Sequence, residues 1–195
     1  MSDVQIMAVK FLADNGSGTI SGAIKAIDYA VNNGAHILSN SWGGGGFSQA
    51  LFDSIEAAKD KGILFVAAAG NARNDNDEWP EYPGTYQIDN IISIGAMEGN
   101  GSKARFSNYG KKTVHVFAPG TSIMSTYKGN NYRRLSGTSM ATPFVSGILG
   151  LALSQNIEAD YLELRQKMID TSVRSRSLSN FTIGGRAEAY QMLLE

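Results

Sequence analysis

The sequence predicts an α/β fold in which a parallel sheet is covered by helices on both faces. Short apolar runs rich in β-branched residues alternate with segments whose apolar residues recur at helical spacing. The run "ILFVAAAG" is apolar almost throughout, which is typical of a strand buried on both faces. The 22 glycines are spread along the chain, which favours many tight turns between strands and helices over a single linker.

The totals indicate one globular domain spanning residues 1–195. Hydrophobic residues make up 43% of the chain and charged residues 18%. A net charge of −1 gives no electrostatic reason to expect nucleic acid or an anionic membrane as a partner. The absence of cysteine excludes disulfides and thiolate metal sites. No apolar run has the length of a membrane span, and the first residues do not resemble a signal peptide.

In the first part of the chain, strands and helices are expected to alternate. "VQIMAVKFL" (4–12) predicts a buried strand, and "TISGAIKAIDYAVNN" (19–33) a helix followed by Gly34. "AHILSN" predicts a strand that runs into a glycine loop. The next helix, "SQALFDSIEAAKDKG", has Ser48 as its expected N-cap and Gly62 as its stop.

The second part continues the pattern. "ILFVAAAGN", "NIISIGAM" and "TVHVFAPG" predict three strands. Residues 121–127 and 131–137 are expected to form a hairpin before a long helix that begins near Ser139. Two amphipathic helices are expected near residues 160–172 and 186–194. The segment 72–86 predicts a long surface loop.

The stretch "GTSMATP" places Ser139 in the first turn of the long apolar helix. Unpaired backbone N–H groups and the positive end of the helix dipole meet there, and this environment suits an alkoxide or oxyanion. Thr138 or Ser136 is the expected N-cap, and Pro143 falls where a missing N–H costs little. The alternative interpretation is a capping sequence without chemistry.

Two further segments fit a site at the carboxyl edge of the sheet. Asn71 follows a buried strand and carries two N–H donors that suit developing negative charge, although a turn-forming Asn is the simpler interpretation. The glycines after "SNSW" leave the backbone unshielded, so an extended peptide could pair with it. A loop without function is the alternative.

Taken together, these segments resemble the subtilisin-like serine proteases, the subtilase family. The resemblance rests on "GTSMATP", "AAAGN" and "NSWGG", with "YPGTY", "ISIGAM", "ARFSNYG", "VFAPG" and "GGRAEAY" in family order over essentially the whole chain. It implies a three-layer, subtilisin-like α/β fold whose N-terminal strands are missing. It also implies a serine endopeptidase that hydrolyses peptide bonds through an acyl-enzyme.

The resemblance assigns roles to particular residues. Ser139 is the nucleophile, and the Asn71 side chain with the Ser139 backbone N–H forms the oxyanion hole. Glu81 corresponds to the base of the S1 pocket, where a carboxylate favours Lys or Arg before the scissile bond; an exposed loop acid is the alternative. The other implied substrate-binding residues are Ser41, Trp42 and Gly43 along the substrate backbone, and Ala68, Ala69 and Gly70 in the S1 wall.

None of the motifs recognised in the sequence contains the general base that Ser139 would need. The family's D-[ST]-G and H-G-T settings do not occur, and the chain is expected to begin just after the His-bearing helix. Of the two histidines, His36 and His115 are each expected to have structural or surface roles. The isolated chain is therefore predicted to be inactive unless an N-terminal fragment or a second chain supplies Asp and His.

Three interpretations remain open. The chain is the C-terminal part of an ordinary protease, separated by cloning, processing or gene annotation. It is a non-catalytic relative that binds peptides or a protease partner. Or it is an independent hydrolase that uses His36 or His115. In each case a sheet without its first strands would expose an edge or an apolar face that needs a cover.

Cofactors and location follow mainly from the resemblance. The chemistry requires no cofactor. The acidic run with Asp75, Asp77 and Glu78 lacks the EF-hand glycine and terminal Glu, so a solvated loop is favoured. The resemblance implies calcium as a structural ion, with the carbonyls of Gly84 and Tyr86 as its ligands. It also implies a peptide or protein substrate and a secreted or extracellular location.

Overall fold

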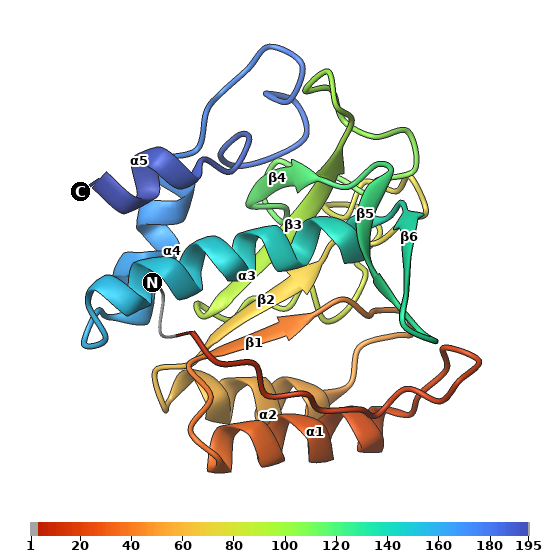
Figure 1. Cartoon of the computed structure of the whole chain (residues 1–195), viewed down its shortest axis with the longest axis vertical. Coiled ribbons are helices and arrows are strands. Elements are labelled where there is room, and N and C mark those ends of the chain that lie inside the picture. The colour runs from red at the N-terminus through yellow and green to blue at the C-terminus, as the bar shows by residue number, and fades with distance from the viewer. Residues whose placement is uncertain (1–3, 195) are drawn as a thin grey trace.

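The computed structural model describes residues 4–194, and its centre is a four-stranded parallel sheet with the order β1-β2-β3-β4 (Figure 1). The strands are β1 (Ile37–Asn40), β2 (Leu64–Ala68), β3 (Ile91–Met97) and β4 (Val116–Pro119). A separate antiparallel hairpin consists of β5 (Ile123–Tyr127) and β6 (Asn131–Leu135). The predicted parallel sheet and hairpin are confirmed.

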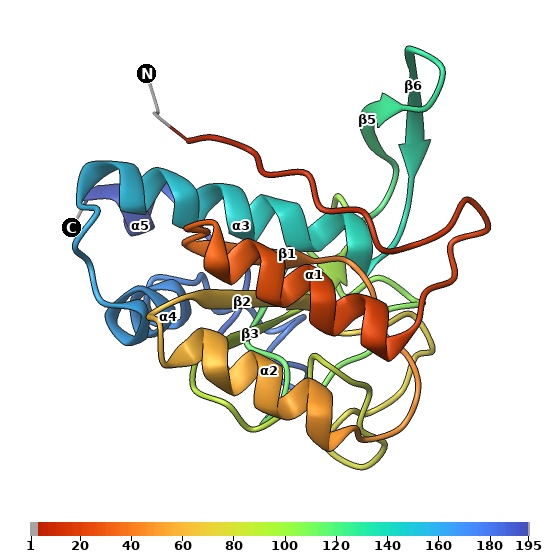
Figure 2. The same ribbon diagram turned by 90° about the horizontal axis from the view of Figure 1, so that it is seen from below.

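Helices cover both faces of the sheet, which gives the predicted three layers. On one face lie α1 (Ile20–Asn32) and α2 (Gln49–Lys59), and across the other runs α3 (Thr138–Gln155) (Figures 1 and 2). The shorter helices α4 (Tyr161–Asp170) and α5 (Ala189–Leu194) contribute to the same core as α3.

The alternation of side chains along β2 explains its unbroken apolar sequence. Leu64 and Val66 belong to the core under α3, whereas Phe65 and Ala67 belong to the core under α1 and α2. All five β2 residues are buried. Each side of the strand therefore meets a helix layer, and neither side selects for polar residues.

The helix ends follow the local chemistry of the sequence. The Ser48 side chain accepts a hydrogen bond from the Leu51 N–H and caps α2, as predicted. Thr19 caps α1 in the same way through the Gly22 N–H. After these helices, Gly34 (φ 79°) and Gly62 (φ 74°) adopt the left-handed conformation that favours glycine.

The predicted strand at Val4 to Leu12 is wrong. The segment is irregular and runs beside α3 and α1 (Figure 2), with Ile6 92% exposed. Phe11 anchors it through an edge-to-face contact with Trp42, at 5.1 Å between ring centres. An apolar β-branched run becomes a strand only where neighbouring strands and a covering layer receive it, and this segment pairs with no strand among the described residues.

The two outer edges of the sheet differ. The outer edge of β4 is covered, because the Phe117 N–H donates to the Gly185 carbonyl and the Ala187 N–H to the Phe117 carbonyl. The outer edge of β1 has no paired strand within residues 4–194. The exposed edge expected from the sequence is therefore at β1.

The segment 72–86 is irregular, as predicted, but not all of it is at the surface. Asn76 and residues 83–86 are buried. The prediction of a surface loop throughout was therefore wrong for these residues. The reason is that their polar groups find partners inside; the Tyr86 hydroxyl, for example, donates to the Ser48 carbonyl.

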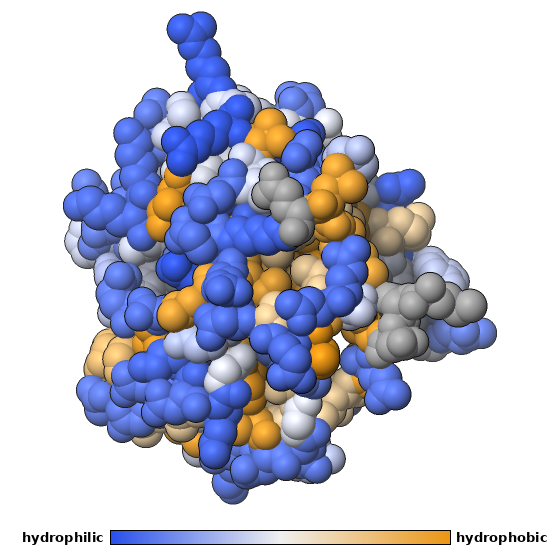
Figure 3. Space-filling model, turned by 90° about the vertical axis from the view of Figure 1, so that its left-hand side faces the viewer, coloured by the Kyte–Doolittle hydropathy of each residue, from blue (hydrophilic) through white to orange (hydrophobic). Residues whose placement is uncertain are grey.

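The outer surface around α4, α5 and the end of α3 mixes apolar and polar side chains (Figure 3). Within residues 4–194, no helix combines the length and the apolar content needed to cross a membrane.

His115 lies buried between β3 and α4. Its Nδ1 accepts a hydrogen bond from the Ser93 N–H at 2.9 Å, and a guanidinium nitrogen of Arg165 lies 2.7 Å from its Nε2. Burial, and secondarily the Arg165 charge, lower the pKa of His115 from 6.5 to about 3. The ring is therefore neutral at pH 7, and the fold opposes its protonation.

We predict that His115 makes the fold acid-sensitive. Between pH 6.5 and 3 the unfolded chain binds a proton at this residue that the folded chain does not, so stability is lost as the pH falls. The loss is several kcal/mol, because each pKa unit corresponds to about 1.4 kcal/mol. Urea unfolding of the wild type and of His115→Asn should show a smaller pH slope in the variant; equal slopes would contradict the assignment.

We also predict that α3 contributes to stability through one face only. Leu149 is fully buried in the core under α3, whereas Leu151 on the same helix is 38% exposed. Leu149→Ala should lower the free energy of unfolding by about 2–5 kcal/mol, and the matched control Leu151→Ala by less than about 1 kcal/mol. Chemical denaturation measures both values, and similar losses would show that the packing is assigned incorrectly.

Candidate active site

The first turn of α3 holds Ser139, but its capping differs from the prediction. The helix begins at Thr138, and the N-cap is Gly137, which offers no side-chain cap. Neither Thr138 nor Ser136 is the N-cap. Instead, Oδ1 of Asn71 accepts hydrogen bonds from the Thr138 N–H (2.8 Å) and the Thr138 hydroxyl (3.1 Å). Asn71 thus takes over the capping role from another part of the chain.

This contact also orients the Asn71 amide. Because Oδ1 faces the fixed N–H of Thr138, the two N–H donors of Nδ2 point the other way. They have no hydrogen-bond partner within the described residues. Asn71 is exposed, so these donors are accessible to a ligand.

Ser139 is partly accessible and is bonded to the loop after β1. Its hydroxyl donates to the Ser41 carbonyl (3.1 Å), and the Ser41 hydroxyl donates to the Ser139 carbonyl (2.8 Å). The second bond has a clear cause: in a regular helix the Ser139 carbonyl would accept the N–H of residue 143, which is a proline. Pro143 therefore frees the carbonyl that Ser41 holds.

Two N–H sources thus flank the Ser139 hydroxyl. The backbone N–H of Ser139 lies in the first helical turn, where no carbonyl earlier in the helix can accept it. The Asn71 amide approaches from the end of β2. Together they can stabilise an oxygen that acquires negative charge near Ser139, and the helix dipole reinforces the effect.

The glycine loop after β1 is open, as the sequence predicts. Gly44 and Gly45 have positive φ angles of 115° and 85°, and a Cβ at either position would touch nothing. The Gly44 N–H donates to the Tyr82 carbonyl, which ties the loop to the segment 72–86. The side chain of Trp42 makes contacts within the protein: its Nε1 donates to Asn40 Oδ1, and its ring packs on Phe11.

The carboxylate of Glu81 lies between the two predicted substrate-binding segments. A Cβ added to Gly70 would come within 2.5 Å of this carboxylate, and one added to Gly43 would lie 3.5 Å from its Oε1. Ala68 and Ala69 are buried beside it at the end of β2. Only glycine at position 70, with φ 107°, leaves room for the carboxylate at this place.

A buried residue that the sequence did not single out holds this region together. The Asn108 amide lies 2.8 Å from Glu81 Oε2 and 3.0 Å from the Ala69 carbonyl. Its Oδ1 accepts the backbone N–H groups of Ala72 and Asn74. Asn108 therefore links Glu81, the wall at Ala69 and the loop after Asn71. Asn108 sits in the motif "ARFSNYG", but sequence alone cannot show which groups converge on it.

Neither histidine meets Ser139. His36 is exposed at the amino end of β1, whereas Ser41 follows the carboxyl end of that strand, roughly 16 Å away at 3.3 Å per residue. His115 is buried, and both of its ring nitrogens face other groups. These positions agree with the structural or surface roles predicted for the two residues.

The residues around Gly84 and Tyr86 do not fit a calcium ion. Both line a polar cavity of about 120 Å³ whose other lining residues include Asp89, Lys112 and Arg165. Two cationic side chains against one carboxylate disfavour a divalent cation. Within residues 4–194, no group of three or more His, Cys, Asp or Glu side chains is placed to hold a metal.

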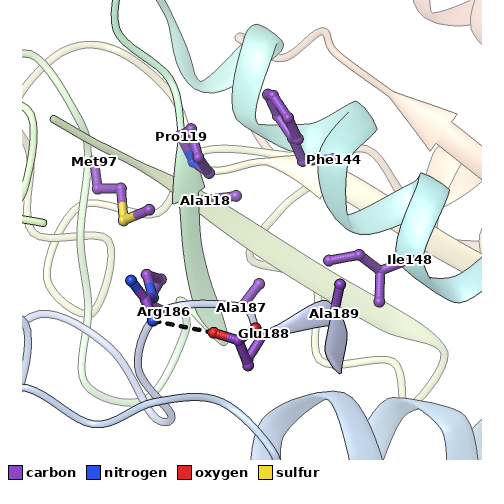
Figure 4. A pocket seen from close by; sticks show the side chains of 9 residues that line it. All are labelled: Met97, Ala118, Pro119, Phe144, Ile148, Arg186, Ala187, Glu188 and Ala189. Carbon is purple, nitrogen blue, oxygen red and sulfur yellow. Dashed lines mark hydrogen bonds and ion pairs between the residues drawn. The ribbon is translucent and has the colours of Figure 1, made fainter. Parts of the chain in front are cut away.

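A larger cavity of about 310 Å³ lies between β4, α3 and the start of α5 (Figure 4). Its lining is largely apolar, and an ion pair of 3.0 Å between Arg186 and Glu188 borders it. Ser139 and Asn71 are not among its lining residues. The cavity is therefore separate from the candidate site.

Comparisons with known proteins identify relatives of this chain. The chain is 39% identical to thermitase of Thermoactinomyces vulgaris over 95% of its length, and 37% identical to subtilisin DY of Bacillus licheniformis over 87%. It covers 64% and 61% of these two relatives, and so spans less than two thirds of their length.

Solved structures show the same fold. The protease domain of PatA matches with a TM-score of 0.80 at 29% identity, over 92% of this chain and 66% of that one. The prenylagaramide maturation protease PagA matches with a TM-score of 0.79 at 26% identity, over 91% and 68%. The family model described as "Subtilase family" matches residues 1–186. With nearly its whole length matched by that model, this chain belongs to the subtilase family.

Proposed function

We propose that this chain is the nucleophile-bearing part of a serine endopeptidase, and that another segment or chain supplies the Asp and His. The observation that carries the proposal is the arrangement at Ser139. Its hydroxyl is accessible, two sets of N–H donors flank it, and no imidazole of the chain reaches it. Family membership supports peptide hydrolysis as the reaction.

In the proposed reaction, the Ser139 hydroxyl oxygen attacks the carbonyl carbon of the scissile peptide bond. The carbonyl oxygen becomes an anion and accepts hydrogen bonds from the Ser139 N–H and the Asn71 amide. An imidazole from outside the chain takes the hydroxyl proton and passes it to the leaving amine. Water then attacks the acyl-enzyme and releases the second product. No cofactor takes part.

The unpaired edge of the sheet supports the proposal that the general base comes from outside the described chain. The outer edge of β1 is unpaired in the described chain, and β1 ends next to Ser41, which is bonded to Ser139. A further parallel strand on this edge would have its carboxyl end near Ser139, where residues of open α/β sheets form their sites. Asp and His carried by such a strand and its following segment would reach the hydroxyl.

The first prediction from this proposal concerns labelling of Ser139 by a fluorophosphonate probe. The isolated chain should react very slowly, because loss of the base costs about 10⁶ in kcat, a magnitude measured on subtilisin itself. Adding a fragment that carries the Asp and His segments of a relative should accelerate labelling by several orders of magnitude. Mass spectrometry locates the label, and Ser139→Ala is the control.

Two outcomes of this experiment would contradict the proposal. Fast labelling of the isolated chain would show that the chain has its own base. Failure of every complementing fragment to accelerate labelling, when the fragments bind, would favour a non-catalytic protein that binds peptides or a protease partner.

We further propose that Glu81 selects Lys or Arg before the scissile bond. Its carboxylate lies between Gly43 and Gly70, where the side chain of that residue would enter. Asn108 holds one carboxylate oxygen, and the other remains for a cation. A charge-assisted hydrogen bond there is worth about 1.5–3 kcal/mol.

The second prediction follows from this geometry. In the complemented enzyme, Glu81→Gln should reduce kcat/KM for substrates with Lys before the bond by roughly 10- to 100-fold, and should leave substrates with Leu there almost unchanged. Glu78→Gln, at an exposed acid in the same segment, is the matched control. If the wild type cleaves after Leu as fast as after Lys, the assignment of Glu81 is wrong.

A further inference from the structure

The charges of this chain are distributed very unevenly along its sequence. Between Glu98 and Glu158 there are seven lysines and arginines and not one aspartate or glutamate. The preceding residues 1–98 carry twelve acidic and five basic residues. The net charge of −1 therefore conceals an acidic first half and a basic segment that includes the nucleophile.

Three of the basic residues lie on the β5–β6 hairpin: Lys128, Arg133 and Arg134. All three are exposed, and the hairpin projects from the body of the protein near the start of α3 (Figure 2). None of them forms an ion pair with a carboxylate in the part of the chain that the structure describes. The hairpin therefore presents unneutralised positive charge to solvent.

The two arginines are held in place. The Arg133 guanidinium lies over the Tyr127 ring, 5.4 Å from its centre, and Arg134 Nη1 donates to the Ser122 carbonyl at 2.9 Å. Such anchoring lowers the conformational entropy that a side chain loses when it binds a partner. Both guanidinium groups keep further N–H donors for an anionic ligand.

The hairpin is attached directly to the nucleophile. Strand β6 leads through Ser136 into Gly137, and the Gly137 N–H donates to the Gly120 carbonyl at the start of the hairpin. The Ser122 N–H donates to the Ser136 hydroxyl at 2.9 Å. The residues assigned to the substrate before the scissile bond, Gly43, Gly70 and Glu81, belong to other segments. The hairpin is therefore the segment beside Ser139 that remains for the part of the substrate after the scissile bond.

We propose that the β5–β6 hairpin recognises acidic residues on the leaving-group side of the scissile bond. This inference rests on the proposed function and extends it. The preferred substrate has a basic residue before the bond, facing Glu81, and acidic residues after it, attracted by the positive charge of Arg133 and Arg134, which lie on opposite faces of the hairpin. The two ends of the site thus select opposite charges, and a peptide bound in the reverse direction meets repulsion at both ends.

An acidic peptide fits this surface better than a nucleic acid does. The exposed Tyr132 and the arginines beside it resemble a surface on which bases stack. However, the acidic first half of the chain, with Glu81 next to the site, repels a phosphate backbone. A peptide with both charge signs satisfies both regions.

The test measures binding, so it does not require catalysis. Fluorescently labelled peptides share Lys before the cleavage position and carry four acidic, four neutral or four basic residues after it. At low salt, the full chain should bind the acidic peptide about 5- to 10-fold more tightly than the neutral one, and the difference should disappear near 1 M salt. Fluorescence anisotropy gives each Kd.

The variants locate the effect. The double variant Arg133→Glu/Arg134→Glu should remove or reverse the preference, and Arg133→Gln/Arg134→Gln should remove it. The matched control Lys25→Glu/Lys61→Glu changes two exposed lysines on the α1 and α2 side and should retain the preference. Circular dichroism checks that every variant is folded.

The other outcomes are distinct. If all three peptides bind equally, the inference fails and the proposed function stands. If no peptide binds, the inference fails, and the labelling of Ser139 in the presence of a complementing fragment decides separately on the proposed function. If a single-stranded thymidine oligonucleotide binds more tightly than the acidic peptide and loses affinity in the arginine variants, the hairpin is a nucleic-acid surface and the proposal is wrong.

Discussion

The candidate site depends on one contact, the hydrogen bonds between Asn71 Oδ1 and the N–H and hydroxyl of Thr138. They join the end of β2 to the start of α3 and cap a helix whose own N-cap residue has no side chain. They also fix the orientation of the amide, because a backbone N–H cannot exchange roles with an acceptor. The N–H donors of Asn71 are therefore directed away from Thr138 before any ligand arrives, which is the condition for preorganised stabilisation of charge.

A second set of contacts makes the surroundings of Ser139 one unit. Pro143 removes the N–H that the Ser139 carbonyl would otherwise accept, and the Ser41 hydroxyl replaces it. On the other side, Asn108 holds Glu81 and the loop after Asn71 together from a buried position. Ser139, the glycine loop and Glu81 are thus held by side chains that come from distant parts of the sequence.

The asymmetry of the sheet agrees with a site of which the described chain contains only a part. Residues 185–187 cover the outer edge of β4, whereas nothing within residues 4–194 pairs with the outer edge of β1. The apolar segment Val4 to Leu12 lies beside that edge with most of its side chains exposed. An unpaired edge and an exposed apolar segment are both costly in water, and both lie on the side where an additional strand would complete the proposed site.

The sequence by itself determined the layers of the fold and named the residues of the candidate site. The apolar run of β2, the capping residue Ser48 and the glycines after α1 and α2 act locally, so their patterns predict structure directly. The tertiary structure decided which groups meet. It assigned the helix cap to Asn71 instead of Thr138 or Ser136, placed Asn108 in contact with Glu81, buried Asn76 and residues 83–86, and left Val4 to Leu12 without a strand partner. These outcomes depend on contacts between residues far apart in the chain, and local propensity carries no information about such contacts.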